Sequence, residues 1–259
     1  AKCNRLTCVG HSLGGAVCDV FSGCINSQRT EDPDFKKLSW VKEEPVLLPE
    51  IGSLAEKEDL GGTYAGFGII ESLYTYGAPA TASPPLNDTT QEDGCFKGLR
   101  AYTEDDMGGG GKQVDARAFS NNFFPHAKMA ALSLQWNKPS HFAKCGQGLD
   151  WPGHYATNYE NWGLHAEKNY IDRLKQLVEK QPQSEVYKTS LLLVGFAFAA
   201  EKPTEIVKKI MQGTMPGWKL VASADTGDAA EPVLLAQDHD SLDCVVALPG
   251  NKAQRKKTY

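Results

Sequence analysis

The stretch that decides the fold is RLTCVGHSLGGAVCDVF, residues 5–21. Residues 5–9 form a short apolar-rich run, which is typical of a buried strand. Residues 10–15 are rich in glycine and indicate a turn, and residues 16–21 then carry apolar side chains at helical spacing. The order strand, tight turn, helix is the setting in which a G-x-S-x-G motif presents its serine at the edge of a sheet.

The serine of this motif, Ser12, is the candidate nucleophile. A serine hydroxyl needs a base to remove its proton and donors for the oxyanion that forms on attack. Gly10 and Gly14 are expected because side chains there would collide with the neighbouring strand and helix, and His11 stands beside the serine. The backbone N–H of Leu13, at the helix N-terminus, is the expected oxyanion donor. A glycine-rich turn without a chemical role is the alternative, but the flanking strand and helix favour a nucleophile.

An acid and a histidine should follow the serine in the order Ser, Asp or Glu, His. Residues 99–103 predict a strand that ends at two candidate acids, Asp105 and Asp106. Four histidines lie in the expected segment: His126, His141, His154 and His165. His165 stands at the start of an amphipathic helix that would hold it in place, whereas His154 lies in an aromatic stretch and stays open as the alternative base.

Composition bounds the class of protein. The chain has 259 residues, 41% hydrophobic and 23% charged, with a net charge of -5. This is ordinary globular composition and gives no electrostatic footprint for nucleic acid. The basic cluster at residues 251–257 is interpreted as a solvated tail. The longest apolar run, residues 191–200, is too short to cross a bilayer, and no signal peptide can be argued, so no compartment is assigned.

The cysteines give no metal-binding pattern. There are seven, an odd number, and no zinc-type C-x-x-C pairs. We expect most of them to be buried thiols, with one or two disulfides left open for a secreted protein. No metal ligand set is predicted.

The rest of the chain predicts an alternation of strands and helices. Further strands are expected at residues 69–76, 218–222 and 242–248. Helices are expected from residue 164, at residues 191–200 and around residues 204–211, with a break at residues 181–184. Residues 26–60 are expected to be a surface excursion and residues 123–162 to be irregular.

Four ordered pieces resemble the fungal-type, or class 3, triacylglycerol lipases. They are LTCVGHSLGGA at residues 6–16, YTYGAP at 74–79, RAYTEDDM at 100–107 and LHAEKNYI at 164–171. The first resembles the family's nucleophile strand and turn, and the second its next strand. The third resembles the strand that ends in the catalytic acid, which implies Asp106 rather than Asp105. The fourth resembles the helix that starts with the catalytic histidine, which implies His165.

The lipase-like pieces stand in an unusual order along this chain. In the family, an N-terminal half-domain precedes the nucleophile, and here residues 218–222 and 236–251 resemble the strands of that half. We therefore interpret residues 1–181 as the C-terminal half of one lipase-like domain and residues 182–259 as the beginning of a further one, in a tandem array. A circular permutation is the alternative. The turn at residues 249–251 stands where the family supplies its second oxyanion donor.

The resemblance implies an α/β-hydrolase-like fold, a mostly parallel sheet flanked by helices with the N-terminal half of the domain missing. It implies hydrolysis of lipid esters, with Ser12 as nucleophile, His165 as base, Asp106 as orienting acid, and Leu13 and Asn251 as oxyanion donors. No metal or organic cofactor is expected. The expected partners are an ester substrate and transient contact with a lipid interface. The alternatives are a carboxylesterase acting on short soluble esters and a non-catalytic lipid-binding or scaffold module.

Overall fold

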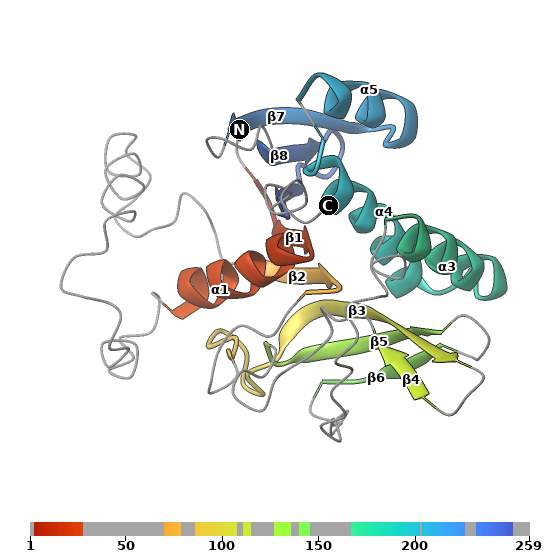
Figure 1. Cartoon of the computed structure of the whole chain (residues 1–259). Helices are drawn as coiled ribbons and strands as arrows, with labels where there is room; N and C mark the ends of the chain where they lie inside the picture. Colours follow the sequence, from red (N-terminus) through yellow and green to blue (C-terminus); the bar gives the residue numbers. More distant parts are fainter. Residues whose placement is uncertain are drawn as a thin grey trace, which may run out of the picture.

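The computed structural model describes residues 3–27, 70–78, 86–107, 111–114, 127–135, 140–145, 167–202, 204–225 and 232–250. Within these ranges the helices are α1 (Leu13–Ser27), α3 (Glu167–Lys180), α4 (Glu185–Ala199) and α5 (Thr204–Thr214). The strands are β1 (Leu6–His11), β2 (Ile70–Tyr76), β3 (Phe96–Met107), β4 (Gly111–Val114), β5 (Met129–Gln135), β6 (His141–Ala143), β7 (Trp218–Asp225), β8 (Pro232–Asp238) and β9 (Cys244–Leu248). Figure 1 shows these elements along the chain.

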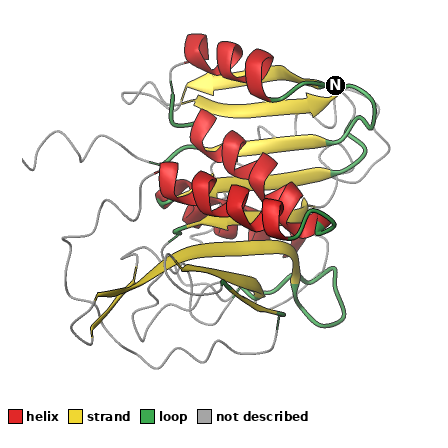
Figure 2. Cartoon of the chain, turned by 90° about the vertical axis from the view of Figure 1, so that its right-hand side faces the viewer, coloured by secondary structure: helices red, strands yellow, loops and turns green. Residues whose placement is uncertain are grey.

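All described strands belong to one nine-stranded sheet. Its order is β6-β5-β3-β2-β1-β9-β8-β7, with β4 paired to β3 off this path. The central run from β5 to β9 is parallel, whereas the pairs toward both edges are antiparallel. Figure 2 shows the strands side by side with helices in front of them. The predicted α/β class with a mostly parallel sheet flanked by helices is confirmed at this level.

Helices cover both faces of the sheet and create two cores (Figure 1). On one face, Cys18 of α1 packs with Cys8 of β1 and the buried side chains of β2. On the other face, α3 and α4 pack against Val9 of β1 and the alternate side chains of β2 and β3. Because successive strand residues point to opposite faces, His11 shares the α3 and α4 face with Val9.

Helix α4 buries the side chains of its second half. The predicted run at residues 191–200 lies within it and just beyond it, and Val194, Phe196 and Ala197 are fully buried. The hydroxyl of Tyr76 on β2 donates a 2.7 Å hydrogen bond to the carbonyl of Ser190, which satisfies a buried polar group. Among the described residues, no helix combines the length and apolar character needed to cross a membrane.

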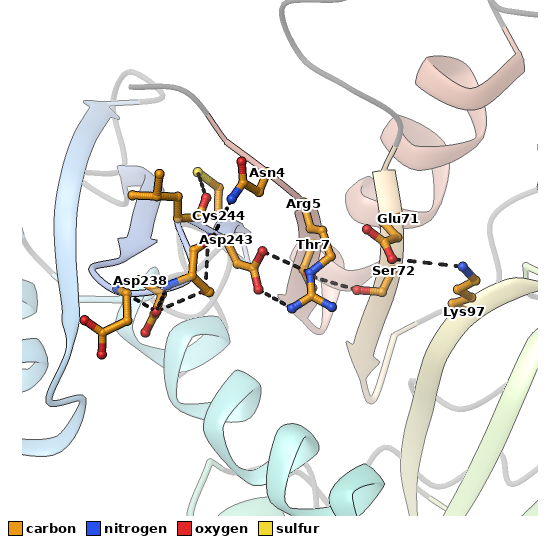
Figure 3. Close-up of polar contacts among 12 residues, drawn as sticks. Asn4, Arg5, Thr7, Glu71, Ser72, Lys97, Asp238, Asp243 and Cys244 are labelled. Atoms are coloured by element: carbon orange, nitrogen blue, oxygen red, sulfur yellow. Dashed lines mark hydrogen bonds and ion pairs between the residues drawn. The ribbon is translucent and has the colours of Figure 1, made fainter.

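Strand β9, the last strand of the described chain, pairs with β1, the first. It pairs in parallel with β1, from Leu6 opposite Cys244 to Gly10 opposite Leu248. Figure 3 shows the start of this junction, where the Arg5 guanidinium binds the carboxylate of Asp243. Residues 1–181 and 182–259, which the sequence assigns to two domains, thus contribute strands to one sheet. Their origin in a tandem array or a permutation stays a prediction.

The expectation that most cysteines are buried thiols was wrong. Six of the seven form disulfides, and the remaining one, Cys24, is not part of a disulfide. The bonds are Cys3–Cys244, Cys8–Cys18 and Cys95–Cys145, with Cα–Cα distances of 5.5, 5.9 and 6.2 Å. These separations lie within the range that disulfides span. The first bond attaches the segment before β1 to β9, and the second attaches β1 to α1.

Several element boundaries differ from the prediction. Gly10 and His11 belong to β1, and α1 already begins at Leu13. The stretch predicted to be irregular contains β5 and β6, because the apolar run MAALSLQ is buried as the continuation of the parallel sheet. Strand β8 was not predicted, and only its last three residues lie within the run 236–251 that resembles lipase strands. Most of the expected excursion, residues 28–60, lies outside the described residues.

Candidate active site

Ser12 occupies a strained turn between β1 and α1. Its φ is 55°, in a region that costs a residue with a side chain roughly 1–2 kcal/mol. The turn is held by backbone hydrogen bonds: the N–H of Ser12 donates to the carbonyl of Tyr76 at 2.9 Å, and the N–H of Ala16 donates to the carbonyl of Ser12 at 3.3 Å. The serine is half-buried. Strain maintained in this way is typical of functional turns.

The glycines of the motif are required by close backbone approach, as predicted. A Cβ on Gly10 would lie 2.3 Å from the carbonyl carbon of Gly14, and a Cβ on Gly14 would lie 2.2 Å from the carbonyl oxygen of Leu248. A Cβ on Gly15 would lie 2.7 Å from the Cβ of Ala78, which follows β2. The turn is therefore pressed between β9 and the chain that follows β2.

His11, the residue before the serine, forms a buried pair. Its Nδ1 lies 2.5 Å from Oε1 of Glu201, and the two side chains are 1% and 7% exposed. Glu201 follows the end of α4. The imidazole also packs against Phe198, with ring centroids 4.4 Å apart, and against Tyr170 of α3 at 5.8 Å. The ring is thus fixed by one hydrogen bond and by aromatic contacts from two helices.

Gly250, after β9, lies directly beside the serine turn. A Cβ on Gly250 would lie 3.1 Å from Oε1 of Glu201, 3.1 Å from the carbonyl oxygen of His11 and 3.4 Å from Cβ of Ser12. The end of β9 therefore flanks Ser12 on the side opposite β2. Asn251, the expected second oxyanion donor, is the next residue and lies outside the described residues.

Asp106 lies in β3 rather than in a loop beyond it. Strand β3 continues to Met107 because β4 turns back and pairs with it, with Asp106 opposite Lys112 and Asp105 opposite Gln113. Gly111, predicted to belong to a flexible loop, begins β4. The backbone of Asp106 is described here, whereas its side chain lies outside the described residues.

Arg100, six positions before Asp106, is buried under the sheet. Its guanidinium carbon lies 5.1 Å from the centroid of the Tyr102 ring. Burial lowers the pKa of Arg100, and the nearby Tyr102 and Asp19 oppose this shift. Since Asp19 lies on α1, the charge that favours the protonated guanidinium comes from the helix that follows Ser12.

The histidines fall into different positions. His165 and its alternative His154 lie outside the described residues, as does His126. His141 is exposed on β6. The predicted helix is present as α3, which is described from Glu167 and buries the Tyr170 side chain as expected. The described structure therefore brings together the residues of the turn, and the pairing of Ser12 with a histidine stays a prediction.

Sequence reasoning missed two residues of this site. Glu201 was not considered, although an acidic residue directly after an apolar helix is a signal of a buried partner for a cation or an imidazole. Gly250 was noted only as part of a turn. Neither residue is close to the motif in sequence: the pairing of β9 with β1 places Gly250, and the packing of α4 on the sheet places Glu201.

Comparisons with protein-family models, with curated proteins and with solved structures found no match for this chain.

Proposed function

We propose that the protein is an α/β-hydrolase-like serine hydrolase, similar to class 3 lipases, that cleaves carboxylic esters of lipids. The observation that carries the proposal is the conformation of Ser12, with a φ of 55° at the tip of a strand–turn–helix unit. The close approaches at Gly10 and Gly14 support the same conclusion. Such a turn exposes the hydroxyl of a serine while the helix N-terminus supplies backbone N–H donors.

The proposed chemistry is acyl transfer. The Oγ of Ser12 attacks the ester carbonyl carbon while His165 accepts its proton, and the resulting oxyanion accepts a hydrogen bond from the N–H of Leu13. His165 then protonates the leaving alcohol, and water hydrolyses the acyl-enzyme with the same histidine as base. Asp106 orients the imidazole. Asn251, following Gly250, is the proposed second donor, and each such donor is worth about 2.7–4 kcal/mol.

The surface beside Ser12 favours an apolar acyl group. Leu13 and Val17 are large apolar side chains that are 43% and 47% exposed. Four residues apart on α1, they lie on the same helix face, which favours contact with an acyl chain or a lipid interface. This observation favours the lipid ester over the short soluble ester. A non-catalytic lipid-binding module would share this surface but not the reactive serine.

A fluorophosphonate probe tests the proposal. The folded protein is expected to be labelled at Ser12, located by peptide mapping, and the variant Ser12→Ala is expected to remain unlabelled. Hydrolysis of p-nitrophenyl esters of increasing chain length is expected to favour long acyl chains. A folded protein that takes no label at Ser12 would reject the hydrolase and leave the binding module. Preference for the shortest ester would indicate the carboxylesterase.

A further inference from the structure

The pair formed by His11 and Glu201 lies against the nucleophile turn. The carboxylate approaches Nδ1 of the histidine to 2.5 Å. The same carboxylate oxygen would lie 3.1 Å from a Cβ added to Gly250, and that Cβ would lie 3.4 Å from Cβ of Ser12. Glu201 therefore contacts the last side chain of β1 and lies beside the backbone that follows β9.

The energetics of this pair depend on its burial. A carboxylate that is 7% exposed is costly to bury unless it is hydrogen-bonded. Losing the carboxylate would remove that acceptor from the buried His11 ring, and this destabilises the ring position that depends on it. Because His11 is bonded covalently to Ser12, a shift of its ring is transmitted directly to the strained turn.

We propose that Glu201 is a positioning residue for Ser12. By accepting the hydrogen bond from Nδ1 of His11, it holds the nucleophile turn of β1 in register with the Gly250 end of β9. The inference rests on the proposed function only for its catalytic consequence. The positioning of the turn itself can be measured without catalysis.

What matters in this proposal is that the Glu201 side chain is long enough to place an acceptor oxygen at Nδ1 of His11. Three substitutions separate the length of the side chain from its charge. Glu201→Gln keeps the reach and the carbonyl acceptor but removes the charge. Glu201→Asp keeps the charge but is shorter by one methylene. Glu201→Ala removes both. The matched control is Glu185→Gln at the exposed start of α4, where the carboxylate contacts only solvent and Lys188.

Two readouts are measured under conditions where urea titration shows each variant folded. The first is the maximal rate of fluorophosphonate labelling, separated from probe affinity. Misplacement of a reacting group by about 1 Å costs up to about 100-fold, so we expect the rate to fall at least about tenfold in Glu201→Ala and Glu201→Asp. The rate should stay within about threefold of the original in Glu201→Gln, with affinity unchanged in all variants.

The second readout is hydrogen exchange of the Ser12 amide, which donates to Tyr76 at 2.9 Å, with the Asp88 amide, bonded to Gly94 at 2.9 Å, as a distant reference. Exchange at Ser12 should accelerate in Glu201→Ala and Glu201→Asp and return in Glu201→Gln. Unchanged exchange in Glu201→Ala, or a Gln variant as impaired as Ala, would overturn the inference. Exchange that follows the expected pattern in a protein that takes no label would sustain the positioning and reject the hydrolase.

Discussion

The closest contact between the serine turn and β9 gives the sharpest prediction. A Cβ on Gly14 would lie 2.2 Å from the carbonyl oxygen of Leu248, about 0.8 Å short of the 3.0 Å below which Cβ contacts are essentially never found. Both partners are backbone, so neither can swing away, and α1 and β9 must separate. Overpacking of this kind costs about 1–3 kcal/mol, occasionally more. It outweighs the gain of about 0.5–1 kcal/mol from replacing glycine in a helix.

We therefore expect Gly14→Ala to lower the free energy of unfolding by about 2 kcal/mol. The matched control is Gly213→Ala near the end of α5, where an added Cβ meets nothing within 4 Å. That variant should be stabilised by about 0.5–1 kcal/mol, because only the helix propensity changes. Urea titration of the oxidised protein measures both.

The comparison has a clear refuting result. If Gly14→Ala unfolds at the same urea concentration as the unmodified protein, or a higher one, the turn does not lie against Leu248 and the pairing of β1 with β9 is wrong. If both variants are stabilised equally, Gly14 is simply a helical glycine.

Three other perturbations test separate parts of the structure. Ser12→Gly removes the strain of the positive φ and should raise the free energy of unfolding by about 0.5–1 kcal/mol while abolishing labelling; a destabilised variant would argue against the strained turn. Thiol titration of the unfolded, unreduced chain should find one free thiol, and replacing Cys3 and Cys244 together by serine should cost about 5 kcal/mol by loop-closure entropy; seven free thiols would contradict the disulfides. The hydrogen bond from Arg5 lowers the pKa of Asp243 below its ordinary 3.8. The unfolded chain therefore binds a proton at Asp243 more readily than the folded protein does. The stabilisation of the folded state by this pair is present above about pH 4 and is lost as the pH falls further. Acid unfolding followed by circular dichroism should depend less steeply on pH in Asp243→Asn than in the original protein. An unchanged acid-unfolding profile would exclude the Arg5–Asp243 pair as a contributor to acid sensitivity.

The serine turn could be predicted because its information is local. Strand, glycine turn and helix follow one another within residues 5–21, and each feature has its own period or residue type. The burial of Tyr170 was predictable for the same reason, from apolar spacing along one helix. In these stretches no distant partner is needed to explain the pattern.

The partners of the turn could not be predicted because they depend on strand order. Nothing near His11 indicates that Glu201, 190 residues away, will meet it. The extension of β3 through Asp106 depends on the return of β4, which a glycine-rich sequence does not distinguish from an open loop. The disulfide between Cys3 and Cys244 likewise required the parallel pairing of β1 with β9 to be known.

That pairing has a consequence for biosynthesis. Cys3 and Cys244 are 241 residues apart, so at roughly 5–20 residues per second a ribosome needs roughly 12–48 s to complete the interval between them. Throughout this time β1 lacks β9 at one of its edges, and an apolar strand with an open edge can pair with other chains. The serine turn is translated before the strand that completes it, so we expect the yield of folded protein to depend on chaperones that shield β1 until β9 emerges.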